Sequence, residues 1–552
     1  MKKQLVLLSS ILIALTSCGV TTPTSSYFSS SKEASSSESE SSVSSETISS
    51  SSSESSSSSE VSSSSSSEVI SSSSSESSSS SEIISSSSSE SSSSSSSEQS
   101  SSSESSSSIA PVPIDPSDVS FGDIFYNPAS KISMKIKMSN LAGRKMSVYG
   151  NDSKNPTADI YHPAEMTLVV NDDTYTFKEV GVRIKGNLSR PNEFIGTDGK
   201  IIELANLKIS FSTDFKDNDY YTPKSDPAVL KERRFAGAKK IDLKWNRNLD
   251  NTFTKEAYAY HMFNQEGLLA SRINIIDFTI ETDSDIQTFK MSAEECIDKQ
   301  YLTRVLGKKD AKGNLYKGNW PCDLTDASSI GVEDCTKGYF PVYDLKTNDD
   351  EPNHELLVNA INELRANDAG KSQSELKSKF DRLVDADSFL KYAALSWLIG
   401  NPDDLRNNKN NSYYYFNSDN KLIVIPRDTD RCFGIKETWD IDMSDQYPTT
   451  TKGYPPQREW ISCPLFWRAI IHSDNGGYSS KWPVITEYEN KYKEYVIEFF
   501  NKYMKESLFK EFTNGFANAP SKQTQTGGGI NQTFDYYANT KKQVLKDLGW
   551  IK

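Results

Sequence analysis

The chain has 552 residues and a net charge of −14, which is enough length for two or three domains. Its acidity is concentrated near the N-terminus. Twelve Glu and a single Lys lie between residues 21 and 108, and they account for 11 of the 14 net negative charges. The remaining chain is only mildly acidic. No basic patch stands out, and this argues against nucleic acid as a partner.

The N-terminus has the pattern of a secretory signal. Lys2 and Lys3 precede an apolar run that is too short for a membrane-spanning helix, and Cys18 follows small residues. This resembles a bacterial lipobox, in which cleavage leaves the Cys as a lipid-bearing N-terminus. We therefore predict a signal peptide over residues 1–18 and lipidation at Cys18, which anchors the protein to the extracellular face of the cell membrane. An ordinary cleaved signal with an incidental Cys is the alternative.

Residues 19–108 are mostly Ser with regularly spaced Glu. They carry too little apolar surface to offset the entropy of an ordered chain, so we predict a disordered, extended tether.

The Cys residues do not favour a zinc site. Five follow Cys18, an odd number without CxxC spacing. Cys322 and Cys335 are close enough in sequence for a disulfide outside the cell, and two free buried thiols are the alternative.

Residues 109–340 are predicted to form a β-rich N-lobe. Strand patterns occur at 131–138, 164–186, 204–212, 239–245 and 273–281. One helix interrupts them at 252–267, with Ala257, Tyr260 and Phe263 on one side and Gly267 at its end.

Residues 341–552 are predicted to form a helical C-lobe. Helical patterns occur at 354–367, 374–385, 385–400, 487–516 and 533–550. The fold class that follows is α+β, with a β-rich lobe, a helical lobe and a cleft between them. This order matches the general plan of a protein kinase.

The strongest chemical signal lies between residues 386 and 434. An apolar helix with Asp385 or Asp387 as its N-cap ends at Gly400. A loop rich in Asp and Asn follows, and then SYYYF and KLIVI flank the turn NSDN as a β-hairpin. Asp428 and Asp430 come directly after the hairpin. In an extended segment residues two apart face the same side, so both could reach one cation.

Protein kinases place their catalytic loop and metal-binding Asp in this same order. The alternative interpretation is that these acids only cap turns, since Asp and Asn are ordinary loop residues.

Several motifs together resemble the CotH family, the atypical protein kinases similar to bacterial spore coat protein H. They are GVRIKGNLS (181–189), ECIDKQYL (295–302), GNLYK (313–317), GNPDD…NNSYYYF (400–416) and VIPRDTDRCFG (424–434). The resemblance covers residues 120–545. It implies a divergent kinase-like fold that uses ATP and Mg²⁺ or Mn²⁺ to phosphorylate proteins on Ser.

The resemblance also implies roles for individual residues. Asp403 matches the catalytic-loop Asp, and Asn411 matches the Asn before the aromatic strand, which also helps to bind metal. Asp428 matches the metal-binding Asp, with Asp430 as the second acid of that motif. Asp404 and Asn408 remain alternatives to Asp403 and Asn411.

Nucleotide contacts are implied for four further residues: Lys185, Lys208, Glu256 and Lys317. Lys185 and Lys208 lie on strands where a phosphate-binding Lys is expected, and Glu256 lies on the helix that could hold the ion-pair partner. Equally, the two lysines could form the solvated side of a strand and Glu256 could be a surface residue.

The chain departs from the family where Pro402 replaces an aromatic residue and Arg427 replaces a Trp. It also lacks the GxGxxG loop and the HRD triplet of ordinary kinases.

The sequence therefore predicts a surface-tethered, metal-dependent Ser kinase, expected as a monomer, whose substrate includes Ser-rich segments such as its own tether. A non-catalytic surface adhesin that keeps the fold is the main alternative, because ATP is scarce outside cells. A glycosyltransferase that uses Asp428 and Asp430 in a sugar-nucleotide motif is a weaker one.

Overall fold

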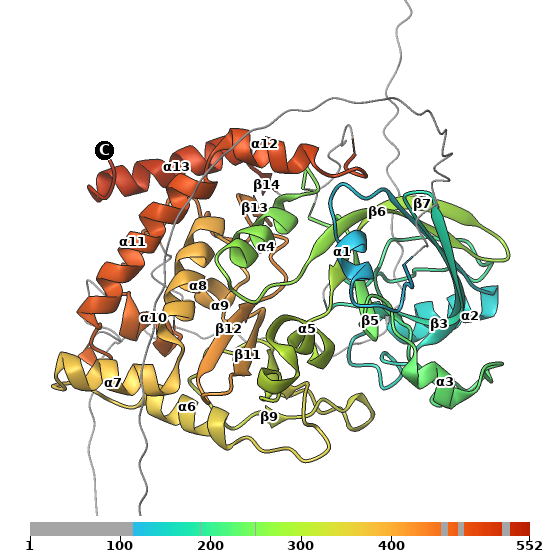
Figure 1. The fold of residues 1–552 in the computed structure, drawn as a ribbon, viewed down its shortest axis with the longest axis horizontal. Helices are drawn as coiled ribbons and strands as arrows, with labels where there is room; N and C mark the ends of the chain where they lie inside the picture. The colour runs from blue at the N-terminus through green and yellow to red at the C-terminus, as the bar shows by residue number, and fades with distance from the viewer. Residues whose placement is uncertain (1–113, 188, 249, 454–461, 473–479, 521–529) are drawn as a thin grey trace, which may run out of the picture. The chain divides into compact units, whose positions relative to one another are not determined.

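The computed structural model describes residues 114–552 except 188, 249, 454–461, 473–479 and 521–529. The predicted signal peptide, the lipidation site Cys18 and the Ser/Glu tether lie outside this part. Within it, every helix is too short or too polar to cross a membrane. The fold is a mixture of sheets and helices, as expected (Figure 1).

Seven strands of the N-terminal half close into a barrel, which the sequence patterns did not predict. The strand order is β1-β2-β3-β4-β5-β7-β6, and a parallel pairing of β1 with β6 closes it. Closure leaves no free sheet edge. The strands are β1 (Ile132–Lys137), β2 (His162–Val170), β3 (Asp173–Lys185), β4 (Asn206–Ser210), β5 (Lys240–Trp245), β6 (Ile273–Glu281) and β7 (Ile286–Glu295).

The barrel has an apolar interior and a charged outer face on β3, β4 and β5. Ile241 and Leu243 of β5 lie in the barrel core. Because successive side chains of a strand point to opposite faces, Asp242 and Lys244 lie on the outside. Lys208 of β4 is directly opposite Asp242 in the β4–β5 register.

Five helices accompany the barrel strands in sequence: α1 (Phe121–Phe125), α2 (Asn140–Gly150), α3 (Pro227–Glu232), α4 (Lys255–Gln265) and α5 (Lys299–Asp310). The predicted helix at 252–267 is confirmed as α4. Its buried residues belong to the large core of the helical half and not to the barrel core. Figure 1 shows α4 between the barrel and α8, and it contacts both α8 and β6.

A second sheet, ordered β12-β11-β8-β10-β9, joins segments from both sides of residue 340. The predicted hairpin is confirmed, since β11 and β12 pair antiparallel from Ser412↔Pro426 to Phe416↔Leu422. The strands are β8 (Leu315–Gly318), β9 (Ile330–Gly331), β10 (Tyr343–Leu345), β11 (Ser412–Phe416) and β12 (Leu422–Pro426). Cys322 and Cys335 are free thiols here, and the thiol of Cys335 donates to Asp159.

The C-terminal half is mainly helical. Its elements are η1 (Cys335–Lys337), α6 (Glu355–Arg365), α7 (Gln373–Leu383), α8 (Ala386–Ile399), α9 (Leu405–Asn408), β13 (Ile435–Lys436), α10 (Pro464–Ala469), α11 (Thr486–Tyr503), α12 (Glu506–Asn514), β14 (Ile530–Asn531) and α13 (Phe534–Asp547).

Helix α8 is the centre of this half and is buried along nearly its whole length. Asp385, one of the two N-cap candidates that the sequence left open, caps its N-terminus by accepting the N–H of Ser388. Gly400 ends it at φ 56°, a left-handed conformation that favours Gly. A Cβ at this position would lie 2.0 Å from the Tyr537 hydroxyl, so the close packing also requires Gly.

Asp368 holds an ion-pair network at the edge of the helical core. Its carboxylate is 1% exposed and binds Lys371 (2.8 Å), Lys379 (2.9 Å) and the buried Arg468. Burial by itself would raise the pKa of Asp368, but the hydrogen bonds from these cations lower it to about 2. Because the folded pKa lies below the ordinary value of 3.8, the network stabilises the protein above that pH and is lost as the pH falls through 2.

We predict that Asp368→Asn lowers the free energy of unfolding by about 3 kcal/mol at pH 7, because it leaves the Arg468 guanidinium buried without a counter-charge. Urea unfolding checks this, and the loss should shrink between pH 4 and pH 2. A loss of the same size at every pH would contradict the ion-pair account.

Candidate active site

A buried lysine joins three acidic side chains from different parts of the chain. The side chain of Lys244 on β5 is 5% exposed, and its Nζ lies 2.7 Å from Glu256 Oε1. It also lies 2.5 Å from Asp428 Oδ1 and 3.5 Å from Asp430 Oδ2. The barrel, α4 and the segment after β12 therefore meet at one ammonium group.

Local structure explains how Glu256 reaches this lysine. Asp250 accepts the backbone N–H groups of Thr252 and Lys255, and this fixes the start of α4. Glu256 lies in the first turn of α4 and approaches the outer face of β5. The sequence analysis named Glu256 but missed Lys244. The available signal was the alternation in KKIDLKW, which places Lys244 on a polar strand face twelve residues before Glu256.

The structure brings Lys185 and Lys208 close to the Lys244 cluster, but their ion-pair partner is Asp242 and not Glu256. Both lie on the outer face of the barrel, and each binds Asp242 at 2.6 Å. Lys208 Nζ also lies 3.3 Å from Cys296 Sγ. These lysines lower the pKa of Asp242 despite its burial. The positive charge of Lys185 is also among the causes that lower the pKa of Asp428, so this pair borders the Lys244 cluster.

Lys317 lies on β8, opposite Tyr413 of β11. Burial lowers its pKa to about 7, and the nearby charges of Arg427 and Lys346 act in the same direction. The Arg427 guanidinium lies 6.0 Å from the centre of the Tyr413 ring. Arg427 thus adds positive charge beside Asp428, whereas Lys317 is only partly protonated near pH 7.

Asp403 and Asp404 have different surroundings, which separates two residues that the sequence left as alternatives. Asp404 caps α9 by accepting the N–H of Asn407 and also accepts the hydroxyl of Ser396. Burial raises the pKa of Asp404 to about 6. We therefore infer that Asp404 has a structural role and holds the loop in place.

The Asp403 carboxylate is held by donors on both oxygens. Asn408 donates to Oδ1 at 2.6 Å, and Asn411 donates to Oδ2 at 3.0 Å. Arg431 forms an ion pair with Oδ2 at 2.9 Å. Both candidate Asn residues therefore contact the same carboxylate. Asn410 also donates to Oδ1, at 3.3 Å, so four side chains from two segments fix the orientation of Asp403.

The backbone of Asp428 departs from the extended segment that the sequence suggested. Its φ is 53°, a left-handed conformation that non-Gly residues seldom adopt. The extended geometry predicted for Asp428 and Asp430 is therefore wrong, because the chain turns sharply at Asp428. Both carboxylates still lie within 3.5 Å of the Lys244 ammonium group.

The charges of the site are unevenly distributed. Burial opposes ionisation of Asp428, but Lys244 and Arg427 lower its pKa well below the usual range. Burial raises the pKa of Asp430 to about 6, and the charge of Asp428 adds to this increase. Burial also raises the pKa of Glu256 to about 8, although Lys244 acts in the opposite direction.

The donor set fits a hard divalent cation. Asp428 and Asp430 supply two carboxylates, and Mg²⁺ in kinase-type sites is held by one or two carboxylates together with substrate phosphates. Asp403 lies too far away to complete a three-carboxylate group with them. Among the described residues, Asp403, Asp428 and Asp430 do not place three carboxylate oxygens all within 4.8 Å of one another. Asp428 and Asp430 therefore suit a metal ion whose remaining ligands come from substrate phosphates. They do not suit a site in which the protein supplies every ligand.

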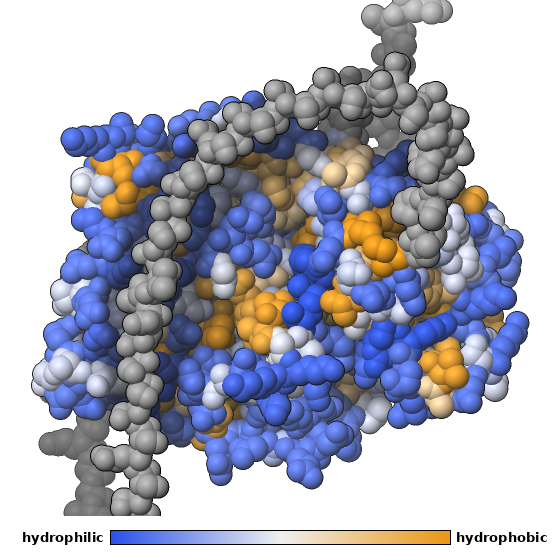
Figure 2. All heavy atoms as spheres, viewed as in Figure 1, coloured by the Kyte–Doolittle hydropathy of each residue, from blue (hydrophilic) through white to orange (hydrophobic). Residues whose placement is uncertain are grey.

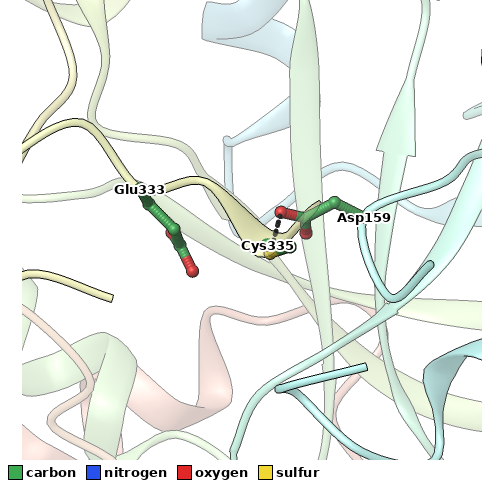
Figure 3. Close-up of side chains that lie close together, drawn as sticks. All are labelled: Asp159, Glu333 and Cys335. Carbon is green, nitrogen blue, oxygen red and sulfur yellow. Dashed lines mark hydrogen bonds between the residues drawn. The ribbon is translucent and has the colours of Figure 1, made fainter. Parts of the chain in front are cut away.

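A second acidic group lies beside a pocket of about 550 Å³, between the barrel loops and the η1 region. It consists of Asp159, Glu333 and Cys335 (Figure 3). Arg183 binds Asp159 at 2.5 Å, and Lys346 lies 3.5 Å from Glu333. Since both carboxylates already have cationic partners, we interpret this group as an ion-pair network.

We predict that Lys244→Met lowers the free energy of unfolding by about 3 kcal/mol in metal-free buffer at pH 8, and by less at pH 5. In the folded protein the pKa of Glu256 is raised from its ordinary value of 4.5 to about 8. The contribution of Glu256 to stability is therefore fully present below pH 4.5 and is lost as the pH rises through 8. Removing Lys244 raises this pKa further. Urea unfolding at the two pH values checks the difference, with Lys240→Met on the same strand as control. Equal losses at both pH values would contradict it.

Comparison with known proteins supports the resemblance found in the motifs. Residues 182–543, more than half of the chain, match the CotH kinase protein family. No curated protein matches the chain. The matched range contains Lys244, Glu256, Asp428 and Asp430, which meet at one ammonium group, and also Asp403. The chain therefore belongs to the CotH kinase protein family.

Proposed function

We propose that this protein is a metal-dependent kinase that transfers the γ-phosphoryl group of ATP to Ser hydroxyls of proteins. The observation that carries the proposal is the contact of Lys244 with both Glu256 and Asp428. Protein kinases require a strand Lys paired with a helix Glu, and a metal-binding Asp that follows the catalytic loop. On this proposal the barrel with α4 (109–340) and the helical half (341–552) act as the two lobes of a kinase.

Phosphoryl transfer depends mainly on positioning and on stabilising charge on the phosphate oxygens. Lys244 provides a compact positive charge beside the metal-binding acids. Arg427 adds a second positive charge beside Asp428. Lys185 and Lys208 share the single counter-charge of Asp242 and leave one net positive charge on the outer face of the barrel. Lys317 on β8 contributes when it is protonated. These positive charges could bind the phosphate groups of a nucleoside triphosphate.

Asp428 and Asp430 would hold Mg²⁺ or Mn²⁺, with the amide oxygen of Asn411 as a further ligand. The bound metal would neutralise charge on the phosphate groups. Asp403 would accept a hydrogen bond from the Ser hydroxyl and take its proton as the oxygen attacks. Asn408, Asn411 and Arg431 hold its carboxylate in one orientation, and such fixed geometry lowers the cost of reaching the reactive arrangement.

We also propose that the enzyme acts at the extracellular face of the membrane, as a monomer anchored through lipid on Cys18. The 19–108 tether supplies many Ser residues beside Glu on the same molecule, at high effective concentration. The tether is therefore the first substrate to test.

The adhesin alternative follows from the scarcity of ATP outside cells, and exposed aromatic residues of the loop at 435–465 could bind its partner. Tyr447 is only partly exposed and packs against the helical core, while Tyr454 and Trp460 lie outside the described residues. The face in Figure 2 is mostly hydrophilic, with separate apolar areas. Trp320 and Trp439 are strongly exposed, at 63% and 61%. The site favours the kinase.

We predict that ATP with Mn²⁺ raises the melting temperature of the protein and that neither ligand does so alone. At 100 times its Kd, a ligand stabilises the folded state by about 2.7 kcal/mol. Asp428→Asn should abolish the shift, because it removes the main metal ligand. Asp419→Asn, in the exposed turn of the same hairpin, should retain it. The absence of any shift in the unmodified protein would favour the adhesin.

We predict that Asp403→Asn lowers the rate of phosphate transfer to the tether about 10²–10⁴-fold, because the base is lost, while the thermal shift with ATP and Mn²⁺ is kept. Asp404→Asn should keep most of the activity, since Asn also caps helices. Mass spectrometry of phosphoserine in residues 19–108 measures this. Equal loss in both variants would contradict the assignment of Asp403.

A further inference from the structure

The hydroxyl of Tyr260 lies between the barrel and the metal-binding acid. Tyr260 is on α4 and is 1% exposed. Its hydroxyl accepts the backbone N–H of Asp428 at 2.9 Å and donates to Glu294 Oε1 at 3.2 Å. A phenol hydroxyl has one proton to donate and lone pairs that accept, so it can serve both partners.

Helix geometry places this contact on the same face as the Lys244 ion pair. Glu256 and Tyr260 are four residues apart on α4, and residues at this spacing lie one above the other on a helix. Glu256 binds the side chain of Lys244, and Tyr260 binds the backbone of Asp428. One face of α4 therefore contacts both the strand lysine and the loop acid.

The backbone of Asp428 needs such support. A left-handed conformation is unfavourable for a residue with a Cβ and persists only where neighbouring groups hold it. The carbonyl of Asp428 accepts from Asn401 Nδ2 at 3.0 Å, which fixes the other side of the residue. Tyr260 and Asn401 thus hold the N–H and the C=O of Asp428 from two different segments.

Glu294 determines which way the Tyr260 hydroxyl points. This residue lies on β7, opposite Asp242 of β5, and is 8% exposed. Because the hydroxyl has one proton and Glu294 is its acceptor, an oxygen lone pair is left for the Asp428 N–H. The direction of the bond to Asp428 therefore depends on the barrel as well as on α4.

We propose that Tyr260 is a positioning residue that couples the placement of α4 to the conformation of Asp428. The proposal rests on the kinase function proposed above. A displacement of α4 would break the Glu256–Lys244 pair and the Tyr260–Asp428 bond together. The orientation of the metal-binding carboxylate is then set by the same helix that supplies the ion-pair partner of the lysine.

Tyr260→Phe tests this, since it removes only the hydroxyl. Tyr258→Phe is the matched control, because Tyr258 is buried on the same helix and its hydroxyl donates to the Tyr503 carbonyl at 2.8 Å, away from the acids. We expect Tyr260→Phe to raise the Mg²⁺ concentration for half-maximal activity about tenfold, the size expected for loss of one buried hydrogen bond. The KM for a synthetic peptide copying residues 60–76 should change less than about twofold. Tyr258→Phe should match the unmodified protein in both.

Hydrogen exchange at the Asp428 amide gives a readout that does not depend on activity. Tyr260→Phe should speed exchange of this amide about tenfold or more, and Tyr258→Phe should leave it unchanged. Unchanged Mg²⁺ dependence with unchanged exchange, or equal effects of both variants, would overturn the proposal. If the unmodified protein shows no phosphate transfer, the proposed function fails, and the exchange rates still decide whether Tyr260 holds Asp428.

Discussion

The buried ammonium group of Lys244 is the interaction on which the site depends. Its single positive charge lies against Glu256, Asp428 and Asp430, which come from α4 and from the turn after β12. Without this cation the site would place acidic groups together out of water, and such groups become protonated instead of staying charged. The lysine keeps Asp428 ionised, which is the state that binds a metal.

Helix α4 connects the two cores of the protein. It follows β5 in the chain, but its apolar side packs with α8 in the core of the helical half. Its Glu256 and Tyr260 face the charged outside of the barrel and the Asp428 turn. A change in the position of α4 would therefore alter ion pairing, backbone support and core packing at once. This makes α4 the element through which the two halves are linked chemically.

The loop between α8 and β11 shows how neighbouring identical residues take different roles. Asp403 and Asp404 are adjacent, yet one is held by amides and Arg431 while the other caps α9. Asp404 is the N-cap of α9, because the first backbone N–H groups of a helix need an acceptor. Asp403 is then left on the side of the loop that faces Arg431 and Asn411.

The sequence by itself determined the local features: the helix that ends at Gly400, the hairpin at 412–426, and the Asp- and Asn-rich loop between them. Each of these depends on residues close in the chain, where caps, turns and strand alternation leave a clear pattern. Tertiary structure decided the closed barrel, the choice of Lys244 over Lys185 and Lys208 as the partner of Glu256, and the left-handed turn at Asp428. These depend on which strands lie side by side and in what register. Strand pairing joins residues far apart in the chain, and alternation within one strand does not specify its neighbour.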